Sequence, residues 1–165
     1  AITYLIASGI RTAASVRVGN QLGMKNITVM REAAFSDYLM VILTQVLFAI
    51  LFISLRFLFP PIFNDEPDVQ AIVASLLLIA ALFQLSDGIQ IVCLGVLRGI
   101  KDTNIPTWIT FITYWIIGLP CCYLLAFRFN LGVEGVWYGL TIALTIAAIA
   151  LFWRFNTVSK KIIFD

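Results

Sequence analysis

One acidic side chain lies deep inside a run of apolar residues. Asp87 follows 18 largely apolar residues that begin at Val69, and the first basic residue, Arg98, comes 11 residues later. In a helix that rises 1.5 Å per residue, the Asp87 carboxylate is about 16 Å from the basic end, near the middle of a ~30 Å hydrocarbon layer. A charge at that depth is costly, and such residues usually mark the path of an ion or a substrate. We therefore predict that Asp87 lies on an ion or substrate pathway, where it holds a proton or pairs with a cation.

Two amide side chains lie near Asp87 on the same side of the predicted helix. Gln84 and Gln90 flank Asp87 at helical spacing, and Gly88 lies between them, whereas the opposite side carries leucine, valine and isoleucine. This arrangement makes Gln84 and Gln90 candidates for lining a cavity. The alternative stays open that each amide, and Asp87 itself, is a structural group that forms a hydrogen bond to a neighbouring helix.

Trp115 is the third candidate cavity residue. By helical rise it lies about 15 Å from Pro106, near mid-depth, whereas tryptophans of the interfacial belts lie close to the headgroups. A tryptophan at mid-depth either packs in the core or offers a flat surface to aromatic ligands.

The composition indicates an integral membrane protein. Of the 165 residues, 61% are hydrophobic and 12% are charged, about half the charged share of soluble domains, which is about 25%. A net charge of +2 gives no reason to expect a nucleic-acid partner. The chain has no histidine, and Cys93, Cys121 and Cys122 lie in apolar runs without CxxC spacing, so we predict no metal site, no cofactor and no disulfide.

Five apolar segments are each close to or above the ~20 residues that a spanning helix needs. Their bounds are roughly 1–22, 37–59, 69–97, 105–127 and 132–155. A β-barrel would need ~10-residue strands that alternate apolar and polar positions, which the sequence lacks. The sequence therefore predicts an all-α polytopic membrane protein with about five transmembrane helices. Because the apolar pattern is already present at Ala1, we expect the chain to open inside a helix.

The basic residues gather in alternate connections. The connections after the first and third segments, together with the tail, carry eight of the eleven lysines and arginines: Arg17, Lys25, Arg31, Arg98, Lys101, Arg154, Lys160 and Lys161. Because connections rich in lysine and arginine stay in the cytoplasm, we predict that these segments and the C-terminus are cytoplasmic.

Four stretches resemble motifs of the multidrug and toxic compound extrusion (MATE) family. They are Ala14–Gly23 (ASVRVGNQLG), Phe83–Gln90 (FQLSDGIQ) with Gly95–Gly99 (GVLRG) and Lys101–Thr103 (KDT), Tyr114–Pro120 (YWIIGLP) and Leu131–Gly139 (LGVEGVWYG). They occur in the family's order over nearly the whole chain.

The resemblance implies that residues 1–165 are a partial C-terminal lobe, most of the second six-helix half of a twelve-helix transporter. It implies antiport in the cytoplasmic membrane, coupled to Na⁺ or H⁺, that exports amphipathic and often cationic organic compounds. In the NorM-like branch the carboxylate of the tenth helix binds the coupling ion, and Asp87 matches that position. A tyrosine that some members carry one turn earlier is Phe83 here. The branch's partner glutamate would lie on helices that precede this chain.

The sequence supports three other functions less well. A lipid-linked oligosaccharide flippase of the same superfamily would be expected to line its cavity with several basic residues, and the predicted cavity face carries only Asp87 before Arg98. A membrane-embedded enzyme would need a nucleophile and a base, or a metal set, that converge at depth, and the sequence offers neither. A structural membrane subunit would leave Asp87 unexplained.

Overall fold

The chain is all-α in the parts that the structure, a computed structural model, describes, which are residues 2–63 and 66–162. Within them there are helices and turns but no strand. The single helices are α1 (Ile2–Gly23), α2 (Ile27–Leu55), the short α3 (Pro60–Phe63), α4 (Pro67–Gly99) and α7 (Gly132–Ser159). The segment between α4 and α7 is one continuous helical rod made of α5 (Asn104–Ile112), the π-helix η1 (Thr113–Gly118), α6 (Leu119–Tyr123) and the π-helix η2 (Leu124–Arg128). The predicted helical fold class is confirmed.

Four of these segments are long and apolar enough to cross a membrane, which supports an integral membrane protein. They are α2, α4, the rod from Asn104 to Arg128, and α7. The sequence predicted a fifth at the N-terminus, but α1 is not among the candidate spans, because its polar side chains, including Arg11, Arg17 and Asn20, make it less apolar than the other four. It nevertheless packs against both α2 and α4.

The predicted start of the second segment, at Asp37, is wrong. α2 begins ten residues earlier, at Ile27, where the Asn26 side chain caps the helix by accepting a hydrogen bond from the Val29 backbone N–H at 3.1 Å. The charged residues of this first part, Arg31 among them, suggested a loop, but its buried Met30 and Ala34 pack into the core. Because Arg17 also lies within a helix, only Lys25 of the three basic residues assigned to the first connection lies in the turn.

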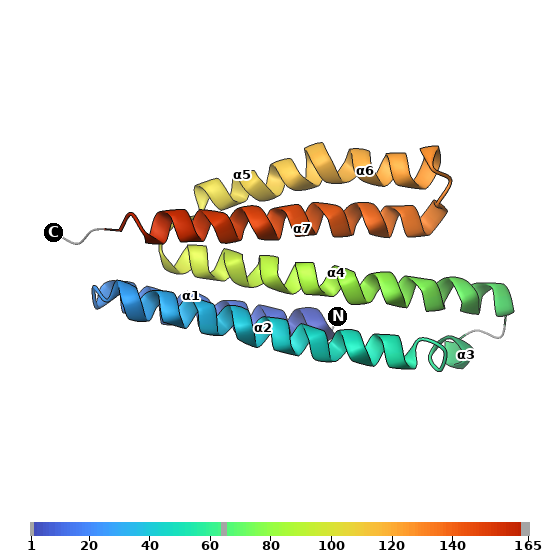
Figure 1. Ribbon diagram of the computed structural model, residues 1–165, viewed down its shortest axis with the longest axis horizontal. Helices are drawn as coiled ribbons and strands as arrows, with labels where there is room; N and C mark the ends of the chain where they lie inside the picture. Colours follow the sequence, from blue (N-terminus) through green and yellow to red (C-terminus); the bar gives the residue numbers. More distant parts are fainter. Residues whose placement is uncertain (1, 64–65, 163–165) are drawn as a thin grey trace.

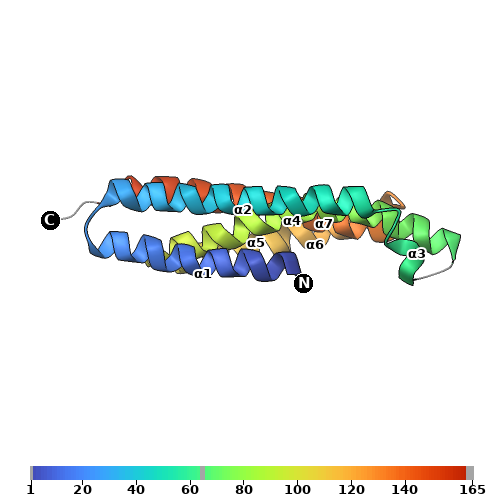
Figure 2. The same cartoon turned by 90° about the horizontal axis from the view of Figure 1, so that it is seen from below.

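The long helices lie side by side along one common axis, as Figure 1 shows. The rod that contains α5 and α6 lies against α7, α7 lies against α4, and α4 lies against α1 and α2. Figure 2 separates α1 from α2, which overlap in Figure 1. As a result, α4 is the central helix and touches α1, α2 and α7.

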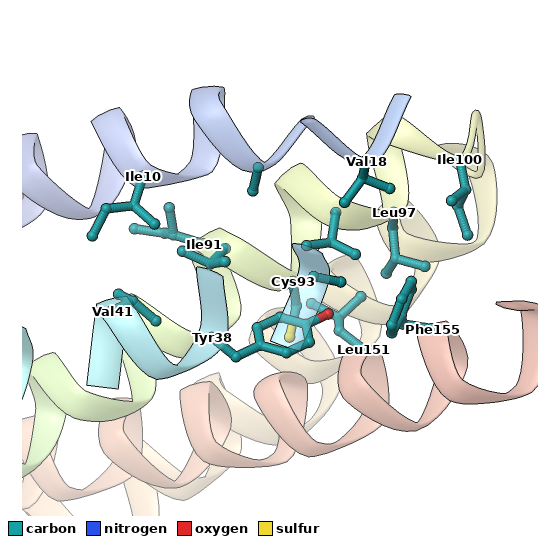
Figure 3. Packing of buried hydrophobic residues seen from close by; sticks show 14 of the residues in the cluster. Ile10, Val18, Tyr38, Val41, Ile91, Cys93, Leu97, Ile100, Leu151 and Phe155 are labelled. Atoms are coloured by element: carbon teal, nitrogen blue, oxygen red, sulfur yellow. The ribbon is translucent and has the colours of Figure 1, made fainter. Parts of the chain in front are cut away.

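The hydrophobic core lies where α1, α2, α4 and α7 meet. Its fully buried members include Val18 of α1, Met30 of α2, Leu97 of α4 and Phe155 of α7. Figure 3 shows the Tyr38 ring of α2 reaching across this core toward Cys93 of α4. Cys93 is one of three free cysteines and is fully buried, so it packs as a small apolar side chain.

Small residues bring the helix backbones close together. A Cβ atom at Gly139 of α7 would lie 2.6 Å from the Cys122 backbone nitrogen, and one at Gly135 would lie 2.6 Å from the Ala126 nitrogen. On α4, a Cβ atom at Gly99 would lie 2.8 Å from the Ser15 carbonyl oxygen of α1. Lipid supplies no hydrophobic drive for helix association, so this close packing is a main source of cohesion.

The helical rod accommodates Pro120 through its π-helical stretches. Proline has no N–H group and its ring clashes with the carbonyl one turn earlier, so a helix must change its hydrogen-bond pattern there. The π-helix η1 ends at Gly118 and Pro120 lies in the first turn of α6. The rod ends with a second π-helix, η2, whose last residue is Arg128. The rod therefore stays helical throughout and follows α7.

The close contact at Gly139 predicts an opposite response of two glycines to the same substitution. Gly139→Ala places a methyl group against the Cys122 backbone and should lower stability by about 1–3 kcal/mol. Gly9→Ala adds a methyl group with nothing within 4 Å and should stabilise α1 by up to about 1 kcal/mol. Thermal unfolding in detergent, followed by circular dichroism, measures both. Equal midpoints for the two variants would contradict the observed packing.

Candidate functional site

Asp87 lies on the central helix and has no direct partner there. It is half-buried, about 18 Å by helical rise from the C-terminal end of α4. Within residues 2–63 and 66–162, its carboxylate forms no hydrogen bond and no ion pair. It is also the only charged residue between Asp68 and Arg98. An acidic group in this position is able to accept a proton or a small cation.

Gln90 lies one turn from Asp87 and is tied to the helical rod. The Tyr114 hydroxyl of η1 donates a hydrogen bond to Gln90 Oε1 at 2.9 Å, and Gln90 is only 4% exposed. The Gln90–Tyr114 hydrogen bond therefore joins α4 to η1 about one helical turn from Asp87.

Gln84 faces α2 rather than the rod. Its Nε2 donates to the Gln45 backbone carbonyl at 3.3 Å, and both side chains are buried. The Gln45 side chain packs on Gly88, where a Cβ atom would lie 2.7 Å from Gln45 Nε2. In the described part of the chain, the Oε1 atoms of Gln45 and Gln84 have no hydrogen-bond partner. Gln84 thus contacts α2, and Gln90 contacts η1.

Trp115 is not brought together with the other candidates. Its side chain is 61% exposed and stacks on Phe111, with ring centroids 6.1 Å apart. Its neighbour Tyr114 points the other way, toward α4. The structure therefore places Asp87, Gln84 and Gln90 along α4 and places Trp115 on an outer surface of the rod.

The sequence did not identify Gln45 and Tyr114, the residues that contact Gln84 and Gln90. Gln45 is an isolated amide in an apolar helix, the same signal that singled out Asp87, and could have been found in the same way. Tyr114 gave no such signal, because its partner lies on another helix and a tyrosine in a membrane segment is common near interfaces.

An ion pair with one buried partner joins α1 to α2, and the sequence did not predict it. Arg17 Nη1 lies 2.5 Å from Asp37 Oδ1; the Asp37 side chain is 2% exposed and the Arg17 side chain is 48% exposed. The sequence placed Asp37 at a helix end, whereas it lies ten residues inside α2. Its second oxygen, Oδ2, has no hydrogen-bond partner among the described residues. Arg17 is therefore the main compensation for a buried negative charge.

The donor set near Asp87 suits a hard monovalent cation or a proton. In the described ranges, no three histidine, cysteine, aspartate or glutamate residues gather as a metal-ligand group. Carboxylate, amide and hydroxyl oxygens are hard ligands, and a single carboxylate balances one positive charge.

The model of the MatE family matches residues 1–124. The chain is 38% identical over 160 residues to a probable multidrug resistance protein NorM of Xylella fastidiosa (strain 9a5c), covering 97% of this chain and 34% of that protein. It is 37% identical over 164 residues to the multidrug resistance protein MdtK of Photorhabdus laumondii, covering 97% of this chain and 36% of that protein. The chain thus spans about a third of the length of the curated relatives it matches.

Two solved structures share this fold. A crystal structure of the eukaryotic MATE transporter AtDTX14 matches with a TM-score of 0.85 at 26% identity, covering 96% of this chain and 37% of that chain. An inward-facing multidrug resistance MATE family transporter of the MOP superfamily matches with a TM-score of 0.86 at 15% identity, over the same shares. The second match bears on the fold alone.

The ion pair between α1 and α2 predicts an asymmetric response to neutralisation. Arg17→Gln leaves the buried Asp37 without its counter-charge, whereas Asp37→Asn leaves a half-exposed arginine that water can solvate. We expect Arg17→Gln to lower the unfolding temperature more than Asp37→Asn does, and the double variant to be more stable than Arg17→Gln alone. A thermal double-mutant cycle in detergent measures this coupling. Additive effects of the two single changes would contradict it.

Proposed function

The chain belongs to the MatE family of transporters, and we propose that it forms part of a cation-coupled exporter of amphipathic organic compounds. Two observations support a role in drug export: relatives at 37–38% identity are named multidrug resistance proteins, and the fold matches MATE transporters. In this proposal the protein moves its substrate across the membrane without changing it chemically. The remaining helices come from other parts of the same transporter.

The observation that carries the proposal is the Asp87 carboxylate. It is half-buried on a helix that spans the membrane, and in the structurally described part of the chain it has no hydrogen-bond or ion-pair partner. A structural acid would be expected to bond to a neighbouring helix, as Gln84 and Gln90 do. We propose that Asp87 binds the coupling ion, Na⁺ or H⁺, while Gln90 and Tyr114 help to position it.

Coupling follows if ion and substrate compete for the charge of Asp87. With the ion bound, the site is neutral; after the ion leaves, the site carries a negative charge that attracts a cationic substrate. Each ligand then weakens the other's binding by the same factor, as linkage requires. We propose that Gln84 lines the substrate path beside α2, and that Trp115, whose flat ring lies on the outer surface of the rod, contacts a substrate only where the remaining helices of the transporter cover that surface.

Neutralising Asp87 should abolish export without unfolding the protein. In the product of the complete gene, Asp87→Asn keeps the side-chain shape and removes the charge, so ethidium efflux from energised vesicles should fall to the rate of vesicles without protein. Asp87→Glu, which keeps a carboxylate, should retain part of the activity. The matched control is Asp68→Asn on the exposed first turn of the same helix, which should export normally. Full efflux by Asp87→Asn under both imposed Na⁺ and H⁺ gradients would refute the role of Asp87.

The distribution of basic residues predicts the orientation of the bundle in the cytoplasmic membrane. In a background without native cysteines, Asn130→Cys, in the turn before α7, should react with an impermeant maleimide in intact cells. Lys160→Cys, after α7, should react only once the cells are permeabilised. The reverse pattern would mean that the C-terminus is not cytoplasmic.

A further inference from the structure

A small cavity lies near the end of the bundle, on the side of Asp87 toward the C-terminus of α4. It has a volume of about 170 Å³ and is bounded by α1, by the last turns of α4 and by the start of α5. Its lining comprises Arg11, Leu94, Arg98, Asp102, Thr103, Pro106, Thr107 and Thr110. Arg11 and Arg98, which come from different helices and lie far apart in the sequence, thus line one small space.

The contact between α1 and α4 positions Arg11 beside this cavity. A Cβ atom at Gly95 would lie 2.4 Å from the Arg11 carbonyl oxygen and 2.6 Å from Arg11 Cγ, so the backbone and stem of Arg11 rest directly on α4. Arg98 follows three residues after Gly95, almost one turn toward the end of α4. The absence of a side chain at Gly95 is therefore what allows Arg11 to come so close to the turn that carries Arg98.

Neither arginine is neutralised by the parts of the chain that the structure describes. Within them, neither Arg11 nor Arg98 forms an ion pair or a side-chain hydrogen bond. Asp102 is the one acidic lining residue, and its Oδ2 accepts a hydrogen bond from Arg154 Nε at 2.8 Å. Arg154 and Asp102 balance each other. The positive charges of Arg11 and Arg98 therefore have no counter-charge among the described residues. Arg11 is half-buried and Arg98 is exposed. Two like charges at one small space repel each other, and an anion between them relieves that repulsion.

The beginning of α5 adds a third positive feature. The first turn of a helix leaves N–H groups without partners inside the helix, and the aligned peptides place partial positive charge there. Thr103, Pro106 and Thr107 line the cavity. Pro106 has no N–H and the Thr107 N–H donates to the Thr103 carbonyl, so the cavity receives the partial positive charge of the helix start and the Thr103 side chain, which makes no capping hydrogen bond. The helical rod that starts here continues to Arg128, so the first turn belongs to a long helix.

We propose that this cavity binds a phosphate-type oxyanion between Arg11, Arg98 and the first turn of α5. Guanidinium groups bind phosphate through paired N–H donors, and the partial positive charge at the start of a helix also favours an anion. The cavity lies where one spanning helix ends and the next begins, which is the level of lipid headgroups. The phosphate of an anionic phospholipid and free inorganic phosphate share this chemistry, and the experiment separates them.

Lipid binding to the purified product of the complete gene tests this site. Native mass spectrometry counts bound phosphatidylglycerol, and thermal unfolding is followed with phosphatidylglycerol, phosphatidylcholine or inorganic phosphate. We expect phosphatidylglycerol to be retained and to raise the unfolding temperature more than phosphatidylcholine does. An equal rise with inorganic phosphate would identify a free anion as sufficient, and no rise with it would identify the lipid as the source.

Single substitutions test whether the bound phosphatidylglycerol occupies this cavity. Arg11→Gln and Arg98→Gln should each lose the retained phosphatidylglycerol and its thermal shift, whereas Arg11→Lys and Arg98→Lys should recover part of both. The matched control is Arg128→Gln, at the opposite end of the rod and exposed, which should behave like the wild type. The proposal is overturned if neither probe stabilises the wild type. It is also overturned if Arg11→Gln and Arg98→Gln keep the full response, or if Arg128→Gln loses as much.

Discussion

The structure depends on one constraint: a polar group in the hydrocarbon layer must find its partner within the protein, because lipid offers none. This constraint acts most strongly on α4, which touches α1, α2 and α7 and carries the polar residues Gln84, Asp87 and Gln90. Two of the three form a hydrogen bond to a neighbouring helix: Gln84 Nε2 donates to the Gln45 carbonyl, and Gln90 Oε1 accepts from the Tyr114 hydroxyl. These hydrogen bonds, with the close contacts at the glycines, fix how α4 faces its neighbours. The helix is therefore held in place around Asp87, which alone of these three side chains forms no hydrogen bond in the described structure.

The sequence was sufficient where the signal is local. The apolar runs predicted α4, the rod and α7 to within a few residues, and the isolated Asp87 identified the helix at the centre of the bundle. It failed where the outcome depends on tertiary contacts. The charged start of α2 appeared to be a loop because its partners on α1 and α7 are distant in sequence: Arg31, for example, donates to Asn156 at 3.2 Å. For the same reason, the sequence does not predict the hydrogen bond between Tyr114 and Gln90 or the contact of Arg11 with α4.

Two sets of charged residues in the bundle differ in whether a neighbouring side chain balances their charge. Pairs such as Arg17 with Asp37 and Arg154 with Asp102 join neighbouring elements and balance their own charge. Asp87, Arg11 and Arg98 have no such balance among the described residues, and they carry the two proposed binding sites, one for a cation and one for an anion. Asp87 and Arg11 are half-buried and Arg98 is exposed. Charged groups that stay unpaired beside an apolar bundle are where ligands of opposite charge are expected. The two proposals therefore rest on the same physical argument applied to opposite signs of charge.

The central claim, that ion and substrate compete for the charge of Asp87, is tested most directly by equilibrium binding. The affinity of the purified transporter for ethidium is measured by calorimetry over a range of Na⁺ concentrations and pH values. The account predicts that raising the concentration of the coupling ion, Na⁺ or H⁺, weakens ethidium binding to the wild type, and that Asp87→Asn removes this dependence while the protein stays folded. Ethidium binding that responds to neither ion in the wild type, or responds equally in Asp87→Asn, would contradict it.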